Sequence, residues 1–233
     1  MKNKTILAVG AHPDDMDFGA SGTLAKLAKE GWEAYLIICT DGSRGSDDPK
    51  MTHQRLVKIR REEQEASGKI LGLKKIFFFN HTDTQLVADL ILKKEIVRII
   101  RKVKPSIVIS MDPTFYYSQD RGFVNHTDHR AAGLAAMDAC FPLCRDRLTF
   151  QELEKDGLTP HRVEELWMVS FDKVDRLVDI SKNIEQKIKA LSMHVSQFAD
   201  FKQVKKRVLE RARILGEKKG FKFAENFVRL KLP

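Results

Sequence analysis

Cysteine is scarce in this sequence, which has only Cys39, Cys140 and Cys144 among its 233 residues. So odd and sparse a set argues against the disulfide framework of a small secreted domain. Cys140 and Cys144 have helical spacing, but Pro142 lies between them and the sequence has no second cysteine pair to complete an all-cysteine zinc site. We therefore expect packing roles for the thiols and a reducing, cytoplasmic location.

The sequence also lacks any apolar run near the ~18 residues that a membrane span requires. Residues 1–9 superficially resemble a signal peptide, but their apolar part is short and runs directly into a His/Asp motif. Pro/Gly/Ser-rich stretches, repeats and low-complexity blocks are absent as well. We expect one domain over residues 1–233, with residues 181–233 as its basic, helical C-terminal part.

Apolar β-branched runs alternate with helical patterns along the chain. The expected strands are 5–9, 34–40, 76–79, 107–110 and 166–171, with a short extra strand at 177–180, and the expected helices are 21–29, 54–71, 88–103, 128–139, 184–193 and 203–215. This alternation is typical of a mainly parallel sheet with helices on both faces. The prediction is an α/β fold, a Rossmann-like three-layer sandwich, with its active site at the carboxyl edge of the strands.

Two clusters of metal-compatible side chains lie more than a hundred residues apart. The first, GAHPDD at 10–15, directly follows the apolar run 5–9 and therefore belongs at the carboxyl end of a buried strand. The second, HTDH at 126–129, opens a segment of strong helix formers. Residues three apart on a helix are neighbours, so His126 and His129 can face one cavity.

A catalytic zinc needs about three protein ligands and an open position for water, and histidine and aspartate are suitable ligands. His12, Asp14, Asp15, His126 and His129 can supply three ligands and still leave a carboxylate and an imidazole for proton transfer. That surplus indicates an enzyme rather than a closed structural site. The first cluster alone is also consistent with an ordinary turn, in which proline sets the backbone and aspartate accepts amide hydrogen bonds.

Four segments together resemble one family. They are AHPDD at 11–15, HTDH at 126–129, Arg60-Arg61-Glu62-Glu63 leading into Leu71-Gly72, and KIKALSMHVSQ at 187–197. They look like the PIG-L/LmbE family, which contains zinc-dependent de-N-acetylases of N-acetylglucosamine conjugates. The match extends over most of the chain, and its motifs specify the superfamily far better than they specify a substrate.

The resemblance implies a role for each residue of the two motifs. His12, Asp15 and His129 would be the zinc ligands, and Asp14 would be the general base that takes a proton from the metal-bound water, whose pKa zinc can lower to ~7. His126, when protonated, would stabilise the oxyanion or protonate the leaving amine.

The resemblance extends to residues around the motifs. Asp128 would hold or charge-tune His126, as carboxylates commonly do for imidazoles. Family members often carry glutamate where this chain has Met16, and Asp17 is a candidate replacement. Arg60 matches a pocket arginine, although a solvated helix charge is an equal alternative. His194 also matches a position near the pocket.

Three loops, 12–22, 41–53 and 111–129, gather at the carboxyl edge of the predicted sheet. Arg44, in the turn-rich second loop, is a weaker candidate for a substrate contact. The third loop carries aromatic and polar residues over 115–123, Tyr117 among them, which would suit the wall of a sugar site. These aromatics are nearly as well explained by packing of the loop onto the domain.

The net charge of +9 is concentrated near the C-terminus, because residues 182–222 hold twelve Lys or Arg and four Asp or Glu. Such a segment can attract an anionic substrate, a membrane surface or RNA. Its basic residues fall on several helix faces and form no recognised nucleic-acid motif, so we favour a solvated surface and expect no nucleic-acid partner.

We therefore predict a zinc-dependent hydrolase, active as a homo-oligomer by resemblance, that removes acetyl from an N-acetylglucosamine derivative. The same site would also suit another small amide or ester. A non-haem Fe(II) oxygenase uses two histidines and one carboxylate too, but on a β-barrel host. A basic RNA- or nucleotide-binding module is a further alternative, because Gly19-Ala20-Ser21-Gly22 weakly resembles a phosphate-binding loop.

Overall fold

The computed structural model describes residues 4–120, 122–171, 173 and 175–233 and is built on a seven-stranded sheet. In spatial order the strands are β3 (Lys75–His81), β2 (Glu33–Thr40), β1 (Thr5–Gly10), β4 (Ile107–Met111), β7 (Glu165–Val169), β9 (Ala224–Lys231) and β8 (Arg176–Asp179). The first five are parallel, and β9 runs antiparallel to both of its neighbours. The predicted α/β fold with a mainly parallel sheet is confirmed.

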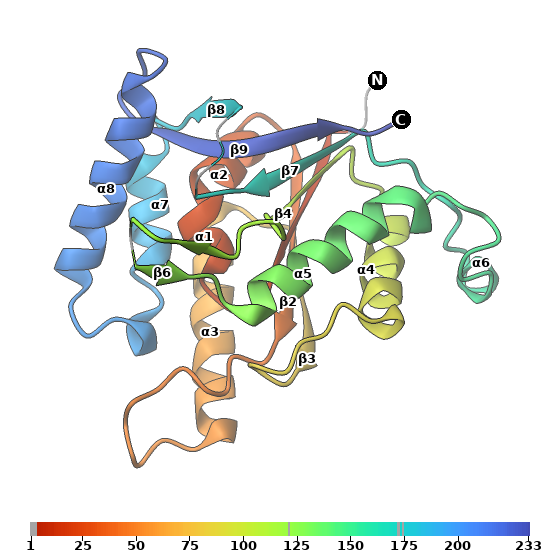
Figure 1. Cartoon of the computed structure of the whole chain (residues 1–233), viewed down its shortest axis with the longest axis horizontal. Coiled ribbons are helices and arrows are strands. Elements are labelled where there is room, and N and C mark those ends of the chain that lie inside the picture. Colours follow the sequence, from red (N-terminus) through yellow and green to blue (C-terminus); the bar gives the residue numbers. More distant parts are fainter. Residues whose placement is uncertain (1–3, 121, 172, 174) are drawn as a thin grey trace.

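Helices cover both faces of the sheet (Figure 1). They are α1 (Asp15–Gly19), α2 (Ser21–Lys29), α3 (His53–Leu71), α4 (Leu90–Val103), α5 (Thr127–Asp138), α6 (Glu152–Lys155), α7 (Ile184–Leu191) and α8 (Phe201–Glu217). Successive side chains of a strand point to opposite faces. Accordingly, Ile6 and Ala8 of β1 join the core under α2 and α8, whereas Leu7 and Val9 join the core under α4 and α5.

The strand order reverses next to β1. The chain passes from β1 outward through β2 to β3, and then returns to form β4 on the other side of β1. The crevice beyond the carboxyl ends of two such strands is where open α/β sheets bind ligands. The first His/Asp cluster directly follows β1 and the second lies in the segment after β4, so the topology brings both to this crevice.

Every expected helix and strand is present, with ends that differ by a few residues. The expectation that residues 181–233 are helical is wrong in part, because they end in strand β9 inside the sheet. Its apolar pattern is interrupted by Glu225 and Asn226, which are buried polar residues, and that is why periodicity did not reveal it.

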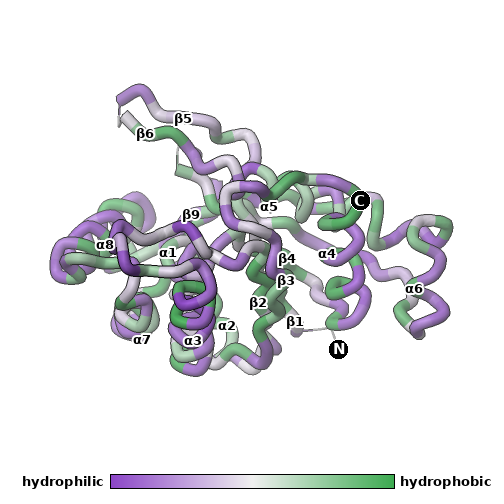
Figure 2. Tube along the Cα trace, turned by 90° about the horizontal axis from the view of Figure 1, so that it is seen from below, coloured by the Kyte–Doolittle hydropathy of each residue, from purple (hydrophilic) through white to green (hydrophobic). Residues whose placement is uncertain are grey.

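The aromatic loop after β4 forms a two-stranded hairpin of β5 (Tyr117–Ser118) and β6 (Phe123–Val124). Figure 2 shows it standing away from the body of the domain. Tyr117 is 68% exposed, so its ring does not pack the loop onto the core. Within the described part of the chain, no helix has the length and apolarity to cross a bilayer.

A buried ion pair fastens the C-terminal strand to the first motif. The Lys187 ammonium donates to Glu225 Oε1 at 2.6 Å, and also to the backbone oxygens of Asp17 at 3.1 Å and Phe18 at 2.6 Å. Both charged side chains are almost completely buried. A buried charge is tolerated only when it is paired and hydrogen-bonded, which each of these is.

The same Glu225 carboxylate caps the start of α2. It accepts the amide hydrogens of Gly22 at 2.9 Å and Thr23 at 2.7 Å, where an anion is favoured by the helix N-terminus. The alternative of a phosphate-binding loop at 19–22 is therefore wrong, since a carboxylate of the same chain occupies these amides and the segment is helical.

Replacing Lys187 by methionine leaves the Glu225 charge buried without its partner. We expect Lys187→Met to lower the free energy of unfolding by about 3–5 kcal/mol in urea titrations. Lys182→Met, which changes an exposed lysine nearby, serves as the matched control and should alter stability by less than about 0.5 kcal/mol. Equal stabilities of the two variants would contradict the role given to the buried pair.

Candidate metal centre and active site

Asp15 occupies the position where the first strand turns into a helix. Its Oδ2 accepts the amide hydrogens of Ala11 at 2.9 Å and His12 at 2.8 Å, because α1 begins at Asp15 and the preceding amides point at its carboxylate. Its Oδ1 lies 3.0 Å from His129 Nε2. One oxygen of this buried carboxylate thus fixes the local backbone, while the other faces the second motif.

The two imidazoles beside Asp15 each have one nitrogen committed elsewhere. His12 Nε2 lies 3.1 Å from Asp83 Oδ1 and 3.2 Å from Asp128 Oδ2, so it carries a hydrogen and leaves Nδ1 available as a ligand. His129 Nδ1 lies 3.0 Å from the side-chain oxygen of Asn125, which leaves Nε2 available. Ligand atoms of His12, Asp15 and His129 lie within 4.8 Å of one another.

This donor set fits a divalent transition metal. Two imidazoles and one carboxylate are suitable zinc ligands, and both histidines have the carboxylate or carbonyl partners that usually orient metal-binding histidines. Burial alone would lower the pKa of His12, but hydrogen bonds to Asp128, Asp15 and Asp83 raise it to about 12. The surrounding carboxylates therefore favour positive charge here, and a metal ion competes with that proton.

Asp14 has an unusual backbone beside the ligands. Its φ of 92° lies in the left-handed region, which Asp and Asn tolerate better than most residues do. Gln64 Oε1 accepts its amide hydrogen at 2.9 Å, and Arg60 Nη2 lies 3.5 Å from its Oδ2. Burial raises the pKa of Asp14 to about 7, against the opposing charge of Arg60. This carboxyl can therefore exchange a proton near neutral pH.

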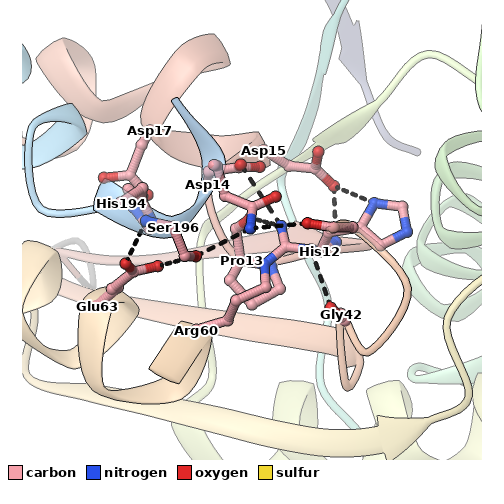
Figure 3. Close-up of polar contacts among 12 residues, drawn as sticks. His12, Pro13, Asp14, Asp15, Asp17, Gly42, Arg60, Glu63, His194 and Ser196 are labelled. Carbon is pink, nitrogen blue, oxygen red and sulfur yellow. Dashed lines mark hydrogen bonds and ion pairs between the residues drawn. The ribbon is translucent and has the colours of Figure 1, made fainter. Parts of the chain in front are cut away.

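Arg60 is a buried pocket residue and not a solvated helix charge (Figure 3). Its guanidinium donates to the backbone oxygens of Pro13 at 2.7 Å and Gly42 at 3.1 Å. Gly42 has φ 63°, and a Cβ there would lie 2.9 Å from Arg60 Nη1, so only glycine allows this close approach. Arg60 thereby joins the first motif to the loop after β2.

His126 and Asp128 interact differently from the expectation. The Asp128 carboxylate accepts the amide hydrogens of Thr84 at 2.7 Å and Leu86 at 3.3 Å and contacts His12, so its hydrogen bonds orient a candidate ligand instead of His126. His126 Nδ1 instead accepts the amide hydrogen of Asp128 at 3.1 Å. Burial and the neighbouring His12 lower the pKa of His126, which favours a neutral ring that carries its hydrogen on Nε2.

His194 is completely buried behind the first motif, with Nε2 3.4 Å from Asp17 Oδ2 (Figure 3). Asp17 also accepts hydrogen bonds from Gln64 at 3.0 Å and from Ser67. Met16 lies in the apolar core. Asp17 is thus a buried carboxylate next to Met16 that holds Gln64 and Ser67, and His194 contacts it without lining the cleft.

A polar cleft of about 370 Å³ lies over these residues. Its lining includes His12, Asp14, Asp15, Arg44, Arg60, Asp83, His126 and His129. Of the predicted site residues, Tyr117, Asp128 and His194 are not in this lining. Tyr117 belongs to the projecting hairpin, and the other two lie beneath the surface.

Sequence reasoning missed Asp83, Gln64 and Asn125. Asp83 lies two residues after β3, at the same sheet edge as the first motif, so its place after a strand was a usable signal. Asn125 directly precedes the second motif. Gln64 had no signal, because only the packing of α3 against the first motif shows that it bonds the Asp14 amide.

Metal binding should depend on the three converging ligands. Protein incubated with zinc and then desalted should retain about one ion per chain by elemental analysis. His129→Ala should lose most of it, whereas His53→Ala, at an exposed histidine at the start of α3, should retain it. A wild-type protein that retains no zinc would refute the assignment.

Comparison with known proteins agrees with the motifs. A family model described as PIG-L, GlcNAc-PI de-N-acetylase, matches residues 7–140. Diacetylchitobiose deacetylase of Thermococcus kodakarensis is 35% identical over 84% of this chain and 71% of its own. The structure of N,N'-diacetylchitobiose deacetylase from Pyrococcus horikoshii, complexed with its inhibitor MPG, is similar with a TM-score of 0.90 and 31% identity, covering 99% of this chain and 85% of that one. A 4-oxalmesaconate hydratase of Pseudomonas putida is 28% identical over 60% of this chain and 55% of its own. The resemblance drawn from the motifs is thus confirmed, and the chain belongs to the PIG-L family.

Proposed function

We propose that this protein is a metal-dependent N-deacetylase that hydrolyses the acetamide of an N-acetylglucosamine derivative. The observation that carries the proposal is the convergence of His12, Asp15 and His129 with a fourth group, Asp14, left outside the ligand set in the same cleft. Family membership supports the reaction class, and the deacetylase relatives support an amino-sugar substrate.

A zinc ion held by these residues would lower the pKa of a water molecule and polarise the amide carbonyl. Asp14 accepts a proton from the attacking water as the water oxygen bonds to the carbonyl carbon. The C–N bond then breaks, and Asp14 returns the proton to the leaving nitrogen. The products are acetic acid and the free amine, and the proton of the acid passes to the amine or to solvent at neutral pH. Gln64 and Arg60 hold Asp14 in place through its amide and its carboxylate.

His126 stabilises the charge that develops on the carbonyl oxygen. Its Nδ1 is occupied by the Asp128 amide, so Nε2 is the donor that remains for an oxyanion. A neutral imidazole suffices for this hydrogen bond, which agrees with the lowered pKa of His126. Asp128 acts on the other side of the centre, where it orients His12.

The polar cleft is the place for the sugar. Its volume is within the range of about 300–1,000 Å³ that small-molecule sites occupy. Arg44 and Arg60 in its lining would donate hydrogen bonds to hydroxyl groups. Tyr117 would contact only a substrate that extends from the cleft to the hairpin.

Other small amides or esters suit the same chemistry. The relative named as a hydratase, at 28% identity, shows that proteins this similar to the chain can carry out a different reaction. The confirmed family and α/β fold favour hydrolysis over the Fe(II) oxygenase and the RNA-binding module. From the resemblance we also propose a cytoplasmic homo-oligomer. The exposed Tyr116, Tyr117 and Val124 of the hairpin region supply apolar surface consistent with self-association.

The substrate class is tested by acetate release. The zinc-loaded enzyme should deacetylate at least one of N-acetylglucosamine, its disaccharide, and its inositol and malate conjugates. Acetylated peptides and simple acetyl esters form the comparison set. Turnover confined to that second set would refute the sugar assignment and leave the hydrolytic site intact.

Two neighbouring carboxylates should respond differently to the same substitution. Asp14→Asn keeps the left-handed backbone and the metal ligands, so it should retain zinc while kcat falls about 10²–10⁴-fold. Asp15→Asn is the matched variant and should lose zinc affinity. Metal analysis and kcat are measured on the same samples, and the opposite pattern would exchange the two roles.

A further inference from the structure

A second cavity, of about 250 Å³, adjoins the candidate metal centre. It lies between α8 and the end of the sheet, and it shares Asp15, Phe18 and His129 with the polar cleft. Two of the three candidate metal ligands therefore face both spaces. An amide whose carbonyl lies at these ligands would place its amine side in one space and its acyl side in the other.

The wall of this cavity is apolar. On α8, Val208, Ala212 and Leu215 follow the i, i+4, i+7 spacing of one helix face. Met111, Val169 and Phe171 are among the residues that complete the wall from the strand ends. Such a surface favours hydrocarbon over a sugar ring.

The polar side chains of the wall already have partners within the chain. Lys187 and Glu225 bond each other. Arg211 lies over the Phe171 ring at 4.9 Å and 3.4 Å from the side-chain oxygen of Asn226, whose amide group donates to a backbone oxygen at 2.8 Å. A sugar entering here would lose hydrogen bonds to water with few replacements, which is unfavourable.

We propose that this cavity is an acyl-binding site, and that the enzyme accepts N-acyl glucosamines with chains longer than acetyl. The proposal rests on the proposed function for the position of the amide. A methyl group needs roughly the volume of one water molecule, about 30 Å³, whereas an apolar cavity of about 150 Å³ already holds benzene. The observed volume therefore accommodates chains of about six carbons.

The test compares N-acetyl-, N-propionyl-, N-butanoyl- and N-hexanoylglucosamine with the zinc-loaded enzyme. Burial of each added methylene should raise kcat/KM, up to about fourfold per group. Val208→Phe, at a half-buried position of the wall, should lower the ratio of hexanoyl to acetyl turnover at least tenfold. Lys206→Phe adds the same ring on an exposed position of α8 and should leave that ratio unchanged.

A binding measurement separates this proposal from the deacetylase assignment. Calorimetric titration of the zinc-loaded protein should show hexanoate binding at least about 50-fold more tightly than acetate, with the difference reduced in Val208→Phe. Equal affinities, or rates that fall with chain length equally in wild type and Val208→Phe, overturn the acyl site. Tight hexanoate binding without turnover of any N-acyl glucosamine supports the acyl site and refutes the proposed function.

Discussion

The carboxylate of Asp15 is the point on which the candidate active site depends. One of its oxygens accepts two successive amides at the end of β1, and the other faces a histidine more than a hundred residues later in the chain. A side chain on a flexible loop would not hold both contacts at once. The central ligand is also a structural element of the strand-to-helix turn, because its carboxylate is buried and hydrogen-bonded to the end of β1.

The acidic residues and histidines around Asp15 have different structural roles. Asp83 and Asp128 take one nitrogen of His12, and Asn125 takes one nitrogen of His129. Asp14 lies outside the ligand group but lines the same cleft, where Gln64 and Arg60 contact it. Residues of the same type thus differ in function because hydrogen bonds to the rest of the fold occupy some of their nitrogen or oxygen atoms and leave only the others free to bind a metal or substrate.

Much of this arrangement could be predicted from the sequence. The parallel strands have continuous apolar runs, the first motif directly follows β1, and the second opens helix α5 in the segment after β4. The fold and the ligand candidates could therefore be inferred from local patterns. Strand β9 could not, because Glu225 near its start is buried against the start of α2, a contact that no local pattern encodes. The expected partner of Asp128 was also wrong. His126 is close to it in sequence, but the Asp128 carboxylate contacts His12. In both cases a polar contact between residues far apart in the sequence determines the structure, and local sequence patterns do not reveal such contacts.

The position of β9 also constrains the order in which the sheet is assembled. Within the described residues, β8 pairs only with β9, although it is made about fifty residues earlier. On a translating ribosome, the five parallel strands can associate while β8 still has no neighbour. During that interval the start of α2 lacks its capping carboxylate, and Lys187 lacks its counter-charge. The nascent chain therefore exposes the outer edge of β7 until β9 is made and pairs with it.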